Sequence, residues 1–271
     1  MKINYPLLAL AIGAFGIGTT EFSPMGLLPV IARGVDVSIP AAGMLISAYA
    51  VGVMVGAPLM TLLLSHRARR SALIFLMAIF TLGNVLSAIA PDYMTLMLSR
   101  ILTSLNHGAF FGLGSVVAAS VVPKHKQASA VATMFMGLTL ANIGGVPAAT
   151  WLGETIGWRM SFLAIPFLAR NEFGAAISMV VWGAATFAVV PPLQMRVMRV
   201  ASEAPGLSSS VNIGAFNLGN ALGAAAGGAV ISAGLGYSFV PVMGAIVAGL
   251  ALLLVFMSAR KQPEAVCVAN S

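Results

Sequence analysis

Charged residues are scarce in this chain. Asp, Glu, Lys and Arg together make up 8% of its 271 residues, whereas 59% are hydrophobic. Soluble globular domains carry about 25% charged residues, so this composition excludes a water-soluble domain and places the chain in a lipid bilayer. The 14 Lys and Arg exceed the 7 Asp and Glu and give a net charge of +7. These basic residues lie in short clusters between apolar runs, which indicates membrane topology and excludes nucleic acid as a partner.

Cysteine is almost absent as well. The single Cys267 lies in a polar stretch, so an intrachain disulfide and a metal site built from thiolates are both excluded. The glycine-rich stretch 13–18 lies inside an apolar run without a preceding strand and therefore does not indicate nucleotide binding. We expect no metal and no cofactor, and an ion gradient is the energy source that the sequence leaves open.

Eight apolar runs are long enough to cross a hydrocarbon core, which takes about 20 helical residues. They are too long and too uniformly apolar for barrel strands, so we predict an all-α polytopic membrane protein with about eight transmembrane helices. The first run lacks a small-residue cleavage site, and we interpret it as a retained span and not as a signal peptide. The predicted spans are residues 6–32, 41–64, 71–90, 93–122, 128–152, 173–195, 207–235 and 237–259.

A further apolar patch, Met160–Leu168, is too short to be a ninth span. Its ~10 uncharged residues reach about 15 Å as a helix, so we expect the patch to lie at the interface or to enter the membrane and return. Eight helices with both termini in the cytoplasm put ten basic residues inside and three outside, which is the bias typical of cytoplasmic loops. The inner residues are Lys2, Arg67, Arg69, Arg70, Lys124, Lys126, Arg196, Arg199, Arg260 and Lys261, and the outer ones are Arg33, Arg159 and Arg170.

Two predicted spans carry small residues at every fourth position. Such stripes let helix backbones approach closely in lipid, where little hydrophobic force drives association. Both spans also contain Leu-x-Asn-x-x-Gly, around Asn142 and Asn220, which favours an internal repeat, although any packed membrane bundle uses glycine. The first stripe is Gly137, Ala141, Gly145, Ala149 and Gly153, and the second is Ala215, Gly219, Gly223 and Gly227.

Two ionisable residues, Glu21 and Arg100, lie inside predicted spans. An ionisable group there costs at least ~2.5 to 3.5 kcal/mol on insertion scales and is a functional candidate by default. The two residues are roughly 15 and 10 Å from the outer ends of their helices, so they can pair. Such a pair either carries a proton or only holds two helices together. Alternatively, Arg100 does not pair and extends to the membrane interface.

The fourth predicted helix has one polar face, which we expect to line a cavity. Its residues are Arg100, Ser104, His107, Phe111 and Ser115. His107 either relays a proton or binds a hydroxyl, or it is a neutral side chain that donates to a backbone carbonyl. A protease dyad of Ser115 with His107 is disfavoured because the two lie about 12 Å apart along the helix. Asn142 and Asn220 either bond substrate or bridge helices, and we favour bridging.

Three stretches resemble the major facilitator superfamily, in its branch of bacterial sugar-efflux and drug:proton antiporters. The first runs from Gly13 through Glu21 to Pro29, the second joins Arg100 to His107-Gly108, and the third is Gly137–Arg159, with Gly144, Gly145 and Pro147 in the position of the antiporter motif. The loop with Arg67, Arg69 and Arg70 resembles the basic gating loop on the cytoplasmic side of the family. Ser65 and Ser104 depart from the family pattern, which usually has aspartate and glycine there.

The resemblance implies a proton-coupled secondary transporter in a bacterial inner membrane. It would export a small solute, sugar or drug-like, by alternating exposure of a midplane site through Glu21, Arg100, Ser104, His107, Asn142 and Asn220.

The family has twelve helices, and the resemblance implies that this chain lacks the equivalents of helices 6–9, with a join near Ala164-Ile165. The predicted organisation is a five-helix bundle at 1–158, a periplasmic or interfacial join at 159–172, three helices at 173–261 and a cytoplasmic tail at 262–271. Either two copies associate as a homo-oligomer to complete the cavity, or the chain is a folded derivative that no longer transports.

Overall fold

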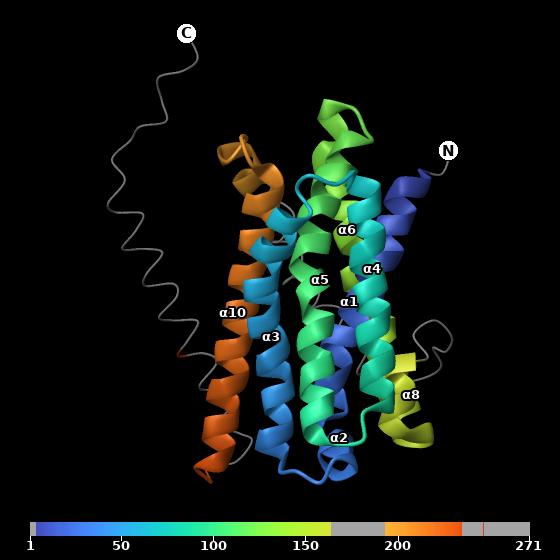
Figure 1. Ribbon diagram of the computed structural model, residues 1–271, viewed down its shortest axis with the longest axis vertical. Coiled ribbons are helices and arrows are strands. Elements are labelled where there is room, and N and C mark those ends of the chain that lie inside the picture. Colours follow the sequence, from blue (N-terminus) through green and yellow to red (C-terminus); the bar gives the residue numbers. More distant parts are fainter. Residues whose placement is uncertain (1–3, 164–192, 235–245, 247–271) are drawn as a thin grey trace.

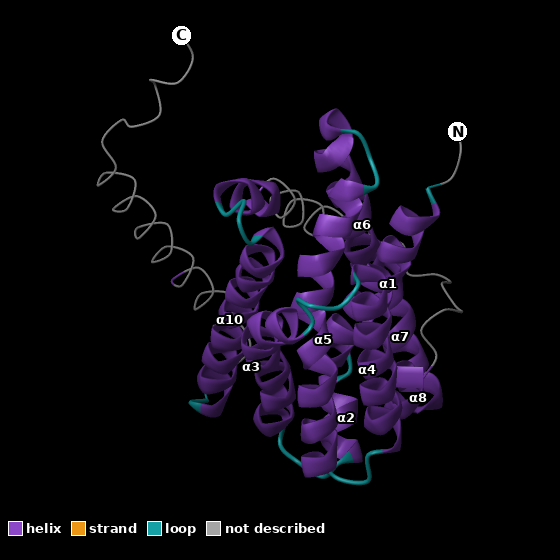
Figure 2. Cartoon of the chain, turned by 45° about the horizontal axis from the view of Figure 1, so that its top comes forward, coloured by secondary structure: helices purple, strands orange, loops and turns teal. Residues whose placement is uncertain are grey.

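The computed structural model describes residues 4–163, 193–234 and 246, and this part is helical without a strand. The long helices run side by side along the longest axis of the molecule (Figures 1 and 2). The first five helices are α1 (Tyr5–Gly26), the short α2 (Leu28–Gly34), α3 (Ile39–Leu63), α4 (Arg69–Ile89) and α5 (Tyr93–Ser120). They are followed by α6 (Gln127–Leu140), η2 (Ala141–Gly145), α7 (Val146–Leu152), η3 (Gly153–Gly157), α8 (Trp158–Leu163) and α10 (Pro205–Ser232).

Three of the long helices, α1, α3 and α5, begin at a residue whose side chain caps them. The side chains of Asn4 and Ser38 accept hydrogen bonds from the first turns of α1 and α3. Asp92 and Thr95 form a reciprocal capping box at the start of α5. The backbone N–H of Thr95 donates to the exposed Asp92 carboxyl and lowers the pKa of that carboxyl below its ordinary value.

Five helical stretches are long and apolar enough to cross a membrane: Tyr5–Gly26, Ile39–Leu63, Arg69–Ile89, Tyr93–Ser120 and Lys124–Phe162. They correspond to the first five predicted spans. The predicted seventh span is the helix α10, of 28 residues, but α10 is not among the five, so its crossing stays a prediction. The predicted spans at 173–195 and 237–259 lie almost wholly outside the described residues.

The fifth span differs from its predicted end at residue 152, because the chain stays helical to Leu163. Gly157 has a φ of +116°, and α8 turns back along α7 from there. The hydroxyl of Ser161 donates to the carbonyl of Ala149 at 2.6 Å, although the two are 12 residues apart. A straight helix would separate them by about 18 Å. The described part of the patch Met160–Leu168 therefore returns beside α7.

The turn at Gly157 is held by Trp158 and Arg159. The Trp158 ring is buried and occupies the space where a side chain at Gly34 would lie. The Arg159 guanidinium lies 4.3 Å from the Trp158 ring, and its Nη2 donates to the Ala90 carbonyl at 2.8 Å. The sequence Gly-Trp-Arg thus fastens α8 to the end of α4 and to α2.

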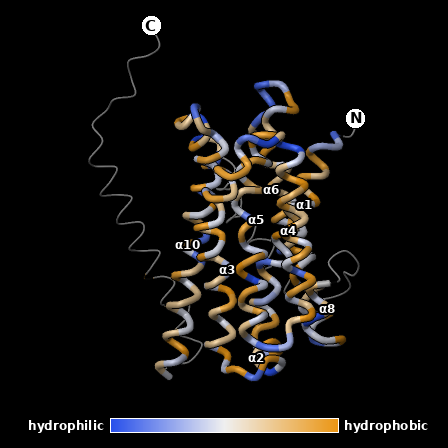
Figure 3. Tube along the Cα trace, in the orientation of Figure 1, coloured by the Kyte–Doolittle hydropathy of each residue, from blue (hydrophilic) through white to orange (hydrophobic). Residues whose placement is uncertain are grey.

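Helix α5 lies at the centre and contacts α1, α3, α4, α6 and α10. Apolar side chains cover the outward faces of the helices, with Leu63, Ile74 and Ile89 each at least 60% exposed. Such a surface is stable against lipid. Figure 3 shows the hydrophobic residues along the helices and the hydrophilic stretches gathered mainly at their ends.

The first small-residue stripe packs directly on α1. A Cβ at Gly137 would overlap the carbonyl oxygen of Ala11, and one at Gly145 would overlap the hydroxyl of Thr19. A Cβ at Gly153 would overlap the side chain of Leu27. Along this contact the backbones approach as closely as the spacing of small residues predicts.

The second stripe was predicted to pack in the same way, and most of it makes no such contact with the described residues. Ala215, Gly219 and Gly223 lie on the exposed face of α10, and only Gly227 is buried. The helix instead packs through the face of Ser210, Gly214 and Asn217, where Gly214 lies against the backbone of Met54 in α3.

The basic loops gather at one end of the bundle. In Figure 1 the α3–α4 connection, the α5–α6 connection and the start of α10 lie at the top, whereas α2 and α8 lie at the bottom. The top connections contain Arg67 and Lys124, and the bottom elements contain Arg33 and Arg159. This is the alternation that the charge bias predicts, although the side of the membrane that each end faces stays a prediction.

Candidate functional site

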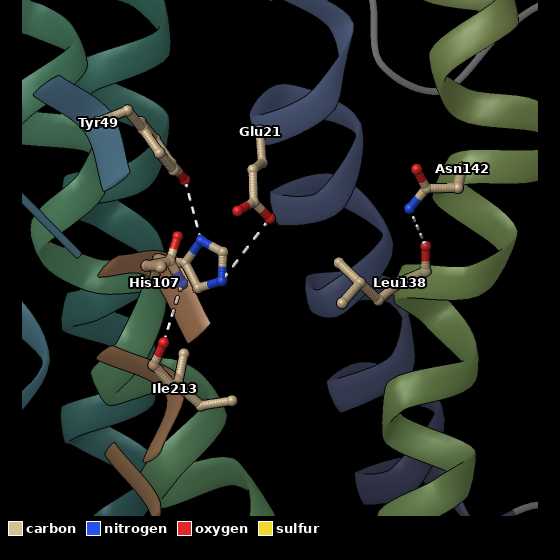
Figure 4. A network of polar contacts seen from close by, with 7 residues as sticks. Glu21, Tyr49, His107, Leu138, Asn142 and Ile213 are labelled. Carbon is tan, nitrogen blue, oxygen red and sulfur yellow. Dashed lines mark hydrogen bonds and ion pairs between the residues drawn. The ribbon is translucent and has the colours of Figure 1, made fainter. Parts of the chain in front are cut away.

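A buried polar group lies where α1, α3 and α5 meet (Figure 4). The carboxylate Oε2 of Glu21 lies 3.9 Å from Nε2 of His107, and both side chains are at most 7% exposed. The opposite ring nitrogen of His107, Nδ1, lies 3.2 Å from the hydroxyl of Tyr49. The His107 ring is also held between aromatic neighbours, with the ring centres of Tyr49 and Phe111 at 6.0 and 5.1 Å.

The expected pairing of Glu21 with Arg100 is wrong in this structure, which pairs Glu21 with His107. Arg100 is 2% exposed, and its guanidinium carbon lies 4.2 Å from the Tyr49 ring centre and 5.6 Å from that of Phe162. Its Nε and Nη1 make no hydrogen bond within the described part of the chain. Among the described residues the buried cation is therefore contacted by aromatic faces and by no carboxylate.

The polar face of the fourth predicted helix is packed against other helices in the described part of the chain, and the expected cavity is not found along it there. Arg100, Ser104, His107, Phe111 and Ser115 are each at most 3% exposed. The Ser104 hydroxyl donates to the Ile101 carbonyl at 2.6 Å and fills the space beside Gly52 of α3. Phe111 stacks on Phe135 of α6, with ring centres 5.1 Å apart. Helix α5 is surrounded by neighbours, so even its polar face meets other helices.

A protease dyad is not formed. The Ser115 hydroxyl has no hydrogen-bond partner within the described residues, and the two ring nitrogens of His107 face Tyr49 and Glu21. A nucleophile needs its base within hydrogen-bond reach, and that contact is missing here.

The two asparagines of the predicted repeat do not bridge helices in the described part. The Asn142 amide donates to the Leu138 carbonyl of its own helical run at 3.1 Å (Figure 4). Asn220 lies on the exposed face of α10. The buried asparagine of α10 is Asn217, whose Nδ2 donates to the Ile213 carbonyl and whose Oδ1 has no partner among the described residues.

The remaining predicted residues lie apart from this buried group. A Cβ added at Gly144 would have no described atom of another helix within 4 Å, and Pro147 is half-buried in α7. Arg67, Arg69 and Arg70 are exposed around the α3–α4 connection. A groove of about 310 Å³ lies between α3 and α10, lined by Met44, Ser47, Ala225 and Ser232 among others.

Several polar contacts were missed by sequence reasoning. Tyr49 touches both His107 and Arg100, and its only signal was a tyrosine in the middle of an apolar span. Thr61 and Ser210 join α3 to α10 through their hydroxyls at 2.6 Å. Gln194 bonds Ser209 at the start of α10. Hydroxyls in apolar helices bond neighbouring helices or their own backbone equally well, so the sequence alone does not separate the two.

A helical bundle of membrane-length spans with an acid, a histidine and an arginine buried at its centre is a polytopic membrane protein of the kind that membrane transport proteins exemplify. Residues 10–169 match the family model of the Major Facilitator Superfamily, and the chain belongs to that family. It is a multi-pass inner membrane transport protein, as the resemblance implied.

Relatives agree with this assignment. The chain is 69% identical over 389 residues to "Inner membrane transport protein YdhP" of Escherichia coli (strain K12), with 100% of each chain covered. It is 33% identical over 211 residues to "Chloramphenicol resistance protein" of Streptomyces lividans, covering 78% of this chain and 54% of the relative. It is 35% identical over 164 residues to "Probable sugar efflux transporter" of Pasteurella multocida (strain Pm70), covering 60% and 40%.

The chain is internally shortened. It has 271 residues, whereas the Escherichia coli relative has 389 and is aligned over its whole length, so the missing residues lie inside the alignment. The predicted join near Ala164-Ile165 lies outside the described residues, and its position stays a prediction.

Proposed function

We propose that this chain exports a small solute, sugar or drug-like, across the inner membrane in exchange for protons. The observation that carries the proposal is the carboxylate of Glu21, buried between helices and 3.9 Å from the Nε2 of His107. Two of the relatives are named for sugar efflux and for chloramphenicol resistance, which supports export of such solutes.

The contacts of Glu21 suit a group that gains and loses a proton. An ionised carboxylate inside a membrane bundle is costly, and a neutral one is tolerated, so its charge depends on what lies beside it. His107 is the group in contact, and it accepts or donates a proton through Nε2. A solute that donates hydrogen bonds to Glu21 competes with the proton there, and this competition is the basis of exchange.

The shortened chain raises a second candidate, a folded derivative without transport. Asn220 and Gly219 lie on an exposed face of α10, and a second copy of the chain packed on that face would complete the cavity. Without such a partner the substrate site has one wall fewer than in the longer relatives, so the same experiment decides between transport and its loss.

The experiment uses the purified chain in proteoliposomes with a pH gradient, acidic inside, and radiolabelled chloramphenicol or a panel of labelled sugars outside. We expect accumulation that collapses when the gradient is dissipated. Glu21→Gln should abolish gradient-driven accumulation but keep exchange of labelled for unlabelled solute, because exchange needs no net proton movement. Glu154→Gln removes an exposed carboxylate and serves as the matched control.

Two results would contradict the proposal. A folded wild-type chain without flux of any of these solutes identifies the inactive derivative. Gradient-driven accumulation by Glu21→Gln at the wild-type rate rules out Glu21 as the proton carrier.

A further inference from the structure

We infer that Tyr49 is a positioning residue that holds His107 in the tautomer with its proton on Nε2, directed at Glu21. Consequences for transport rest on the proposed function, whereas the tautomer itself does not. The inference starts from the side chain that touches both the histidine and the buried arginine.

The Tyr49 hydroxyl lies 3.2 Å from Nδ1 of His107, and both side chains are at most 4% exposed. A neutral imidazole has one N–H donor and one acceptor nitrogen. When the hydroxyl donates to Nδ1, the imidazole proton is on Nε2, which faces the Glu21 carboxylate at 3.9 Å.

The opposite arrangement is disfavoured on both sides of the ring. If Nδ1 donated to the tyrosine, the hydroxyl proton of Tyr49 would have no acceptor among the described residues, because His107 is the only hydrogen-bond partner that it has there. While Glu21 is ionised, the lone pair of Nε2 would also face a carboxylate oxygen and be repelled by it. The two edges of the imidazole therefore favour the same tautomer.

Arg100 fixes the ring that carries this hydroxyl. Its guanidinium lies 4.2 Å from the Tyr49 ring centre, at the distance of a cation–π contact. The ring of Phe162 from α8 lies 5.6 Å from the same guanidinium. The contact restricts movement of the whole Tyr49 side chain and so keeps its hydroxyl near Nδ1. Tyr49→Phe removes the hydroxyl and leaves the ring for Arg100, so it separates the two contacts.

The test is ¹⁵N NMR of labelled histidine in the full chain in lipid nanodiscs. His66 and His125 are exposed, so His66→Gln with His125→Gln leaves His107 as the only histidine of the chain. We expect the protonated-nitrogen signal at Nε2 and the unprotonated signal at Nδ1, assigned by couplings to the ring carbon protons. Tyr49→Phe should lower the ratio of the two tautomers about fivefold, the factor to which one ordinary hydrogen bond corresponds.

Tyr93→Phe is the matched control. It removes a tyrosine hydroxyl that donates to the Ala41 carbonyl at 2.8 Å elsewhere in the bundle, and it should leave the His107 spectrum unchanged. The proton on Nδ1 in the wild-type chain overturns the inference, whatever the variants do. An unchanged ratio in Tyr49→Phe overturns it as well. The NMR measurement uses no solute, so its result can be interpreted even if the chain does not transport. A failure of the tautomer prediction likewise leaves the transport experiment interpretable.

Discussion

The close contact between α6 and α1 predicts that two neighbouring glycines respond oppositely to the same substitution. A Cβ at Gly137 would lie on the carbonyl oxygen of Ala11 and 2.8 Å from its carbonyl carbon. These are backbone atoms of α1, so no rotamer change relieves the overlap and the helices must separate. Gly144 has no described atom within 4 Å of the corresponding position.

The magnitudes follow from this difference. Overpacking in a tight contact costs about 1–3 kcal/mol, and alanine returns about 0.5–1 kcal/mol over glycine in a helix. Gly137→Ala should therefore destabilise the chain by about 1 kcal/mol, within a range of about 0–2.5 kcal/mol. Gly144→Ala adds only the higher helix propensity of alanine, so it should be neutral or stabilising by up to about 1 kcal/mol.

The assay is thermal unfolding of the two purified variants in one detergent, followed by tryptophan fluorescence and by size-exclusion elution after heating. We expect the transition of Gly137→Ala below that of the wild type and that of Gly144→Ala at or above it. Equal shifts of both variants, or a stabilised Gly137→Ala, would refute the packing of α6 on α1.

Three further predictions concern charge and topology. Arg100→Met removes a buried cation that contacts no carboxylate among the residues that the structure describes, so the unfolding temperature should stay or rise while gradient-driven transport is lost; a large destabilisation would contradict this. The lowered pKa of Asp92 stabilises the folded chain at pH values above the pKa that the carboxyl has in the unfolded chain, and this stabilisation is lost as the pH falls through the pKa of the folded state. Asp92→Asn should therefore weaken the pH dependence of the unfolding temperature over that acidic range. In a Cys267→Ser background, Asp36→Cys and His125→Cys should react with an impermeant maleimide from opposite sides, and labelling from one side would refute the alternation.

The helices were predictable, and the partner of Glu21 was not. Length and apolarity determine where a helix runs, and the rise per residue determines the depth of a side chain to within a few ångström. Depth placed Glu21 near the level of Arg100, but Arg100 and His107 lie on the same face of α5 about two turns apart, so depth alone did not decide between them. In the packed structure the carboxylate lies beside His107, whereas the Arg100 guanidinium lies on the Tyr49 ring, and the sequence carries no signal for that choice of side-chain contacts.

The two small-residue stripes show the same limit. A spacing of four residues advances about 40° per step around an α-helix of 3.6 residues per turn, so a stripe at that spacing drifts off its face. In α10 the drift is visible, because Ala215, Gly219 and Gly223 are exposed and Gly227 is buried. The run from α6 to α8 contains the π-helical turns η2 and η3, each of which takes more residues per turn and offsets the drift. Its stripe therefore stays against α1 and the Leu27 that caps it from Gly137 to Gly153. The same spacing of small residues is thus packed in one stripe and mostly exposed in the other.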